Sequence, residues 1–210
     1  MFNDSSPPRG YASLETYGAS DGAQAGARLR NAHDLLDWMN SYRAGLREEV
    51  LAELSPELRK TLETAPRTAW ITIEEDSAFL DGVLAVLGRR EAKQMWRAYA
   101  ARFVETPLVR SLFEGTRRLL GLDVGGMARQ VPRIWGQSFR GVGDMEAIPQ
   151  DDASLVIMLT ELHPLMLRNP AYLILFEGMF AGLFDLMKSS PNIEVTRAPE
   201  TGSATFVLCW

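Results

Sequence analysis

One long apolar stretch, residues 169–189 with the sequence NPAYLILFEGMFAGLFDLMKS, constrains the fold more than any other part of the chain. The side chain of Asn169 can cap a helix, and Pro170 follows at the first helical position, where its missing N–H costs nothing. Roughly 18 helical residues make a rod of about 27 Å, close to the thickness of a bilayer core. Because Glu177 and Asp185 interrupt the stretch, we predict a buried helix and no membrane span.

On both sides of this helix the hydrophobic pattern has a period of two. Residues 144–148 and 154–162 read as two strands before it, and residues 192–197 and 204–210 read as two strands after it. We therefore predict an α+β fold in which an N-terminal helical part precedes a β-β-α-β-β unit. In that unit a four-stranded antiparallel sheet packs on the buried helix, with other helices or a partner subunit on the opposite face.

The chain before residue 140 is predicted to be helical. The predicted helices begin at residue 25 and continue over 45–54, 56–65, 74–87, 89–103, 106–120 and 127–139. We expect Gly88 to end a helix and Pro132 to bend or split one. The predicted organisation is a disordered tail (1–24), a helical subdomain (25–70) and a ligand-binding-like domain of helices plus the β-β-α-β-β unit (71–210). The alternative for the tail is a docking segment that uses its two tyrosines and Leu14.

The composition argues against two classes of function. A net charge of -5 and a pI near 5.2 do not suit a nucleic-acid-binding protein, which needs a basic face. The single cysteine, Cys209, excludes a disulfide framework and a cysteine-based zinc site within one chain. Since the N-terminus lacks a secretory signal pattern, we expect a reducing, cytoplasmic setting.

Four phrases of the chain resemble a large family of paralogous proteins of unassigned function found in myxobacteria. They are WITIEEDSAFLDGVLAVLG, RFVETPLVRSLFEGTRRLLG, QVPRIWGQSFRGVGDMEA and GSATFVLCW, and the resemblance runs from about residue 25 to residue 210. That family is similar to a wider group. It includes vinyl-reductase-like ligand-binding domains, haem-nitric-oxide-binding (H-NOX) domains and the small subunits of the TRAPP tethering complex, which share a Phe-Glu-Gly phrase like that of residues 176–178.

The resemblance to this group implies a set of expectations. Its members bind apolar effectors, haem or an acyl chain between helices and sheet, or use the fold to dimerise. This chain departs from two branches: it lacks the cysteine cluster that holds zinc in vinyl-reductase-like domains, and the Tyr-x-Ser-x-Arg phrase of the haem-binding branch. We therefore expect no metal and no cofactor.

Several aromatic residues are candidates for an apolar ligand pocket. Trp135, Phe139, Phe176, Phe180 and Phe184 could line such a pocket, and the first four are the candidate ligand contacts, although aromatic residues at helical spacing more often belong to the core. Glu177 is also a candidate ligand contact, since a carboxylate in an apolar helix needs solvent, a ligand or a cation. The candidate cations are Arg133, Arg140 and Arg168.

Three further residues are expected to have structural roles. Gly178 and Gly182 share one face of the helix, where we expect them to permit close approach of the helix to the sheet. His163 is expected to tie down a turn through a backbone hydrogen bond, with ligand binding as the alternative. Neither His163 nor His33 has a partner at metal-ligand spacing.

The sequence favours a non-catalytic sensory or regulatory domain. It would bind a small apolar ligand between the central helix, the sheet and the preceding helices, and act by shifting helix packing or self-association. The alternative is a ligand-free interaction or scaffold module that forms a homodimer through its helices or binds a signalling partner. We do not expect an enzyme, because no acid–base pair or nucleophile constellation is present.

Overall fold

The computed structural model describes residues 24–106, 110, 130–151, 153–186 and 191–210. Its helices are α1 (Leu29–Tyr42), α2 (Leu46–Glu53), α3 (Pro56–Thr64), α4 (Ile73–Val104), α7 (Val131–Ser138), α8 (Pro164–Arg168) and α9 (Pro170–Leu186). One antiparallel sheet has the order β2 (Trp70–Thr72), β1 (Gly26–Arg28), β3 (Phe139–Arg140). The other has the order β4 (Asp144–Asp151), β5 (Ser154–Thr160), β7 (Ser203–Cys209), β6 (Asn192–Ala198). The predicted mixed fold of helices and antiparallel strands is confirmed.

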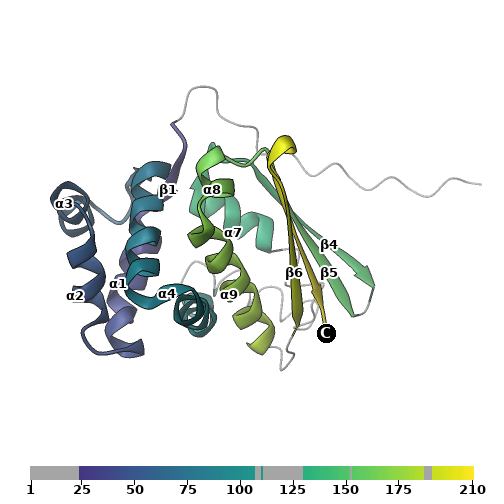
Figure 1. Ribbon diagram of the computed structural model, residues 1–210, viewed down its shortest axis with the longest axis horizontal. Coiled ribbons are helices and arrows are strands. Elements are labelled where there is room, and N and C mark those ends of the chain that lie inside the picture. Colours follow the sequence, from purple (N-terminus) through teal and green to yellow (C-terminus); the bar gives the residue numbers. More distant parts are fainter. Residues whose placement is uncertain (1–23, 107–109, 111–129, 152, 187–190) are drawn as a thin grey trace, which may run out of the picture.

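The helices and the larger sheet form successive layers. Figure 1 shows β4–β7 at one end of the molecule, α9 beside the sheet, α4 next to α9, and α1–α3 at the opposite end. A continuous cluster of buried apolar side chains runs through these layers, from Ala27 of β1 to Leu208 of β7. The tail predicted for residues 1–24 and the helix predicted for 106–120 fall almost entirely outside the described residues.

Helix α9 is the buried helix that the sequence predicts. The side-chain oxygen of Asn169 accepts a hydrogen bond from the Ala171 N–H at 2.8 Å, as a capping residue does. Phe180 of α9 packs edge-on against Phe206 of β7, with ring centroids 5.2 Å apart. Two strands of the larger sheet come before α9 in the chain and two after it, but the short helix α8, which was not predicted, lies between β5 and α9.

Helix α4 is divided at Gly88, as predicted. This residue has φ 67° and ψ 167°, outside the helical region and on the side that favours glycine. The two halves of α4 run in different directions on either side of it (Figure 1). The second half lies against α9, and α4 and α9 form the most extensive contact between elements of the fold.

The small sheet β2-β1-β3 was not predicted. It joins the start of the described chain to residues 70–72 and 139–140, and the guanidinium of Arg28 lies 4.0 Å from the ring centre of Trp70. Strands of two or three residues leave too little pattern to be found in a sequence. The expectation that Pro132 bends a helix was wrong: Pro132 lies in the first turn of α7, where a proline is tolerated.

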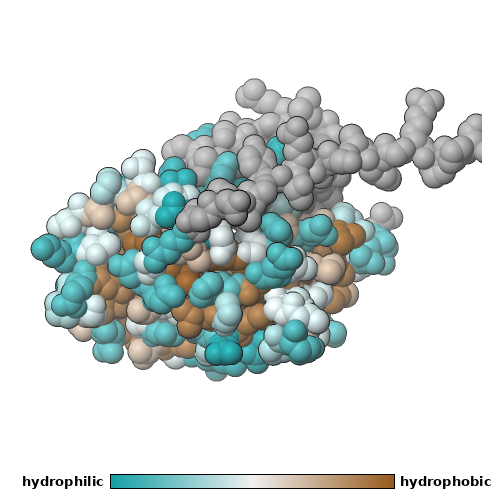
Figure 2. All heavy atoms as spheres, turned by 90° about the horizontal axis from the view of Figure 1, so that it is seen from above, coloured by the Kyte–Doolittle hydropathy of each residue, from teal (hydrophilic) through white to brown (hydrophobic). Residues whose placement is uncertain are grey.

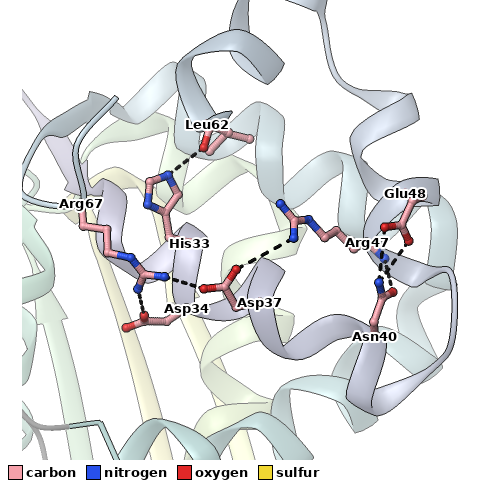
Figure 3. A network of polar contacts seen from close by, with 8 residues as sticks. All are labelled: His33, Asp34, Asp37, Asn40, Arg47, Glu48, Leu62 and Arg67. Carbon is pink, nitrogen blue, oxygen red and sulfur yellow. Dashed lines mark hydrogen bonds and ion pairs between the residues drawn. The ribbon is translucent and has the colours of Figure 1, made fainter. Parts of the chain in front are cut away.

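The N-terminal helices are held together by polar contacts as well as by their apolar faces (Figure 3). Arg67, in the segment after α3, pairs with Asp34 and Asp37 of α1. The Nε2 atom of His33 lies 2.7 Å from the carbonyl oxygen of Leu62 in α3. These contacts connect α1 to α3 and the segment that follows it.

The outer surface is mixed. In Figure 2 hydrophilic residues cover much of the face seen from above, and hydrophobic atoms lie between them near its middle. Within the described ranges, none of the helices combines the length and the hydrophobicity that crossing a bilayer requires.

The start of α4 gives a first testable prediction. The Thr72 hydroxyl accepts the Glu75 N–H at 3.1 Å, and the Glu75 carboxylate accepts the Thr72 N–H at 2.9 Å, which is a capping box. Thr72→Ala should lower the free energy of unfolding by about 1 kcal/mol and Tm by about 3 °C, measured by circular dichroism. Glu75→Gln, which keeps an oxygen acceptor, is the control and should lose less. An unchanged Tm in Thr72→Ala would contradict the cap.

Candidate functional site

A cavity of about 130 Å³ lies between α1, α4, α7 and α9. The described residues that line it are mostly aromatic and aliphatic. The aromatic ones are Phe79, Trp96, Tyr99 and Phe103 from α4, Trp135 and Phe139 from α7 and β3, and Phe176 and Phe180 from α9. An apolar cavity of about 150 Å³ can hold a benzene ring, so this cavity has the size for a small ligand.

The four aromatic ligand contacts proposed from the sequence all line this cavity, whereas Phe184 is not in its lining and packs on Trp210 with ring centroids 5.0 Å apart. The Trp135 ring centre lies 4.7 Å from that of Phe139 and 5.8 Å from that of Phe176, which in turn stacks on Phe180 at 6.2 Å. The Trp135 Nε1–H donates to the Gly143 carbonyl at 2.8 Å, so the polar end of the indole is satisfied outside the cavity wall. These rings therefore belong to the core and border the cavity at the same time.

Glu177, the fifth predicted ligand contact, lies elsewhere. Its carboxylate pairs with the ammonium of Lys93 in α4, not with any of the three expected arginines, and it is not among the residues that line the cavity. Two turns further along α9, Asp185 pairs with Arg97 of α4 through two hydrogen bonds of 2.6 Å. Both acidic residues of the apolar helix therefore form ion pairs that connect α9 to α4.

Gly178 and Gly182 permit a close approach, but to another helix and not to the sheet as expected. A Cβ atom at Gly178 would lie 2.5 Å from the Trp96 Cβ and 2.7 Å from the Lys93 carbonyl oxygen. At Gly182 it would lie 2.5 Å from the Ala100 Cβ and overlap the Arg97 carbonyl oxygen. The two glycines therefore seat α9 directly on the backbone of α4, between the two ion pairs.

His163 precedes α8 and caps it. Its Nδ1 atom accepts the Leu165 N–H at 3.4 Å, and the residue is not among those that line the cavity. Within the described part of the chain there is no group of three or more His, Cys, Asp or Glu side chains that could hold a metal ion. The cavity is thus the candidate site.

The most unusual residue of the cavity wall, Asp76, was not predicted as a site residue. Its side chain is buried, with 8% of its surface exposed, and its Oδ2 accepts a hydrogen bond from the Tyr172 hydroxyl at 2.8 Å. Burial raises the pKa of the carboxyl from 3.8 to about 6, although the Tyr172 hydrogen bond acts in the opposite direction. Burial, followed by the nearby Asp76 charge, raises the pKa of Tyr172 as well.

A pattern in the sequence could have found Asp76. It lies in the first turn of α4, where acids are common because they suit the helix dipole. However, it also occupies the apolar stripe that Ile73, Leu80 and Val83 define, all of which are buried. An acid on the buried stripe of a helix is a candidate functional residue, because structures rarely bury a carboxyl without a cation.

Tyr99 is a second titratable residue in the lining of this cavity. Its hydroxyl is buried and has no hydrogen-bond partner in the described structure. Desolvation by burial raises its pKa. Buried hydroxyls normally have a partner, so this one is an exception. The charged groups that act on it, among them Asp34 and Arg102, line a separate polar hollow and not this cavity.

Comparison with known proteins shows similarity of fold alone. No protein-family model matches the sequence, and no curated protein does, so the resemblance to the myxobacterial family depends on the four sequence phrases. Solved H-NOX structures do match. An oxygen-binding H-NOX domain related to soluble guanylate cyclases has a TM-score of 0.58 at 12% identity, covering 86% of this chain and 92% of its own. The Fe(II) unliganded H-NOX protein from K. algicida has a TM-score of 0.53 at 12% identity, with coverages of 86% and 94%.

Another matching structure comes from work on haem distortion in the H-NOX family, but the residues of this chain do not fit haem. The whole chain has two histidines and one cysteine, the usual side chains for an axial ligand. His33 and His163 make backbone contacts outside the cavity, and Cys209 is exposed at the end of β7. A cavity of about 130 Å³ is also far smaller than a porphyrin.

Proposed function

We propose that this protein is a non-catalytic sensory or regulatory domain that binds a small apolar ligand in the cavity between α1, α4, α7 and α9. The observation that carries the proposal is the aromatic lining of that cavity, to which three helices and β3 contribute rings. The similarity in fold to H-NOX domains supports a ligand-binding role. The ligand contacts in this proposal are Trp135, Phe139, Phe176 and Phe180.

The signal in this proposal is a change in helix packing. The α4–α9 contact is tight, because Gly178 and Gly182 leave no room between the two helices. The walls that α1 and α7 contribute have no such glycine contact with α9. A ligand that prefers one arrangement of α1 and α7 shifts the population towards it, in proportion to its difference in affinity for the two arrangements.

This mechanism assigns different roles to two parts of the chain. In our proposal residues 71–210 form the ligand-binding part, and residues 25–70 form a helical subdomain that transmits the change to a partner or to a second copy of the chain. Leu35 of α1 lines the cavity and Trp38, one turn later, packs on Tyr99 with ring centroids 5.3 Å apart. Helix α1 therefore connects the cavity to the N-terminal helices.

Native mass spectrometry of the purified protein tests this proposal, because it reports the oligomer and any bound mass together. A small added mass that is lost on denaturation is the expected result. A dimer without added mass, and without binding of toluene as a neutral probe, would instead indicate the interaction module.

Filling the cavity gives the matching prediction. Ala32 is buried on α1 and lines the cavity, so Ala32→Leu should occupy part of the space of about 130 Å³. We expect toluene binding, measured by calorimetry, to weaken at least about tenfold, with thermal stability kept because an existing void is filled. Ala52→Leu on the exposed side of α2 is the matched control. Equal toluene affinity in Ala32→Leu and the control would contradict the site.

A further inference from the structure

Among the described residues of its wall, the cavity has one carboxylate and no cationic side chain to pair with it. Asp76 and Tyr99 are its titratable side chains, and no lysine, arginine or histidine is among the described residues that line it. Among the described residues the Asp76 carboxylate has no ion-pair partner. It accepts a hydrogen bond from the Tyr172 hydroxyl, which is itself uncharged. Asp81 and Glu74, the other charged groups near Tyr172, are acids. A buried carboxylate without a cation is unfavourable, so this charge is suited to a cationic ligand.

The rest of the wall suits the same kind of ligand. Rings from Phe79, Trp96, Trp135 and Phe176 line the same cavity as Asp76. An aromatic face attracts an organic cation through its quadrupole, and this attraction is strongest where water is excluded. Aromatic rings together with a single carboxylate are therefore a recognition site for a small organic ammonium ion.

We infer that the ligand of the cavity is a small protonated amine with an apolar body, with its ammonium group on Asp76 and its body among the aromatic rings. This inference rests on the proposed function, since it names the ligand class for the same cavity. The Tyr172 hydroxyl is a positioning group in this arrangement: it occupies Oδ2 of Asp76 and leaves Oδ1 for the ligand. The hydrogen bond from the ammonium to the carboxylate would be charge-assisted and short.

Two probes of nearly equal size separate charge from shape. Benzylamine and benzyl alcohol have the same number of non-hydrogen atoms, but at neutral pH benzylamine is a cation. We expect benzylamine to bind the wild-type protein at pH 8 at least about tenfold more tightly than benzyl alcohol, measured by calorimetry. Asp76→Asn should remove this preference, so that the variant binds the two probes with affinities within about twofold of each other. Tyr172→Phe, which keeps the charge of Asp76, should retain the preference.

The pH dependence in the wild-type protein is a second measurement that needs no variant. Benzylamine stays protonated between pH 5 and pH 8, whereas Asp76, with a pKa of about 6, gains its proton. Benzylamine affinity should fall by about tenfold from pH 8 to pH 5, while benzyl alcohol affinity stays constant.

The outcomes distinguish the two proposals. Equal affinity of both probes at every pH would overturn the ammonium inference and leave the apolar cavity as a binding site. Failure of benzylamine, benzyl alcohol and toluene to bind would overturn the proposed function and the inference with it. Benzylamine binding that Asp76→Asn does not weaken, or that does not depend on pH, would place the amine elsewhere on the protein and overturn the inference alone.

Discussion

Gly178→Leu is expected to prevent folding or to lower the free energy of unfolding by more than about 4 kcal/mol. A leucine side chain there has to pass through the Lys93 carbonyl oxygen and the Trp96 Cβ, which are only 2.7 and 2.5 Å from the position of its first carbon. Both obstacles are fixed to the backbone of α4, so no rotamer change removes them. The two helices would have to separate, and this separation would break the Lys93–Glu177 and Arg97–Asp185 ion pairs.

Urea denaturation monitored by circular dichroism measures this loss of stability. A Gly178→Leu protein that is insoluble on expression would also agree with the prediction, since it would not have folded. The matched control is Gly136→Leu in α7, where a Cβ meets no atom within 4 Å and the residue is exposed. The control should stay folded, since leucine is also the better helix former. If Gly178→Leu unfolded at the same urea concentration as Gly136→Leu, the α4–α9 contact described above would be wrong.

Gly178 and Gly182 show which part of the helix packing could be predicted from the sequence and which part could not. The spacing of Gly178 and Gly182 identified a face of α9 that approaches another element closely, and this is correct. It could not identify the other element, because a glycine pair has the same pattern whether the neighbour is a sheet or a helix. The same limit applies to the prediction for Glu177. Its need for a cation was predictable, but the identity of the cation was not, because Lys93 lies 84 positions earlier in the chain.

Local signals were the reliable ones. The Asn169 cap, the break at Gly88 and the alternation in residues 204–210 depend on interactions within a few residues, and the structure has a helix cap, a helix break and a strand at these places. The three-stranded sheet depends on pairing between segments that are about 40 to 110 residues apart in the chain, with two or three residues each, and was missed. Pro132 was misjudged because its effect depends on where a helix begins.

The candidate site was predictable to the extent that its aromatic residues recur at helical spacing. Trp135 and Phe139, like Phe176 and Phe180, are four positions apart, and all four line the cavity, although Phe139 lies in β3 just after the end of α7. Asp76 and Tyr99 come from the two halves of α4, on opposite sides of Gly88, and both reach the same cavity. The direction that the helix takes after Gly88 brings them together, and that direction cannot be read from the sequence of α4 alone.

Asp76→Asn is expected to change how stability depends on pH. The folded protein holds the Asp76 proton up to a pH of about 6, whereas the unfolded chain loses it near 3.8. Between these values the folded state binds more protons than the unfolded state, so stability falls as pH rises and the loss is complete above about pH 7. The difference of about 2 pKa units corresponds to about 3 kcal/mol at pH 8, and to less than about 1 kcal/mol at pH 4.

Asparagine cannot ionise, and its side-chain oxygen can still accept the Tyr172 hydroxyl hydrogen bond, so the variant escapes this loss. Its buried NH₂ group adds a penalty that does not depend on pH. The measured quantity is therefore the change in stability of Asp76→Asn relative to wild type, which should become more favourable by about 2.5 kcal/mol from pH 4 to pH 8 in urea denaturation. Asp81→Asn, at an exposed position of the same helix, is the control and should change much less. If the difference in free energy of unfolding between Asp76→Asn and wild type stayed constant over this pH range, Asp76 would not be buried as a carboxyl in the cavity wall. The proposed amine site would then have no carboxylate to bind the ammonium group.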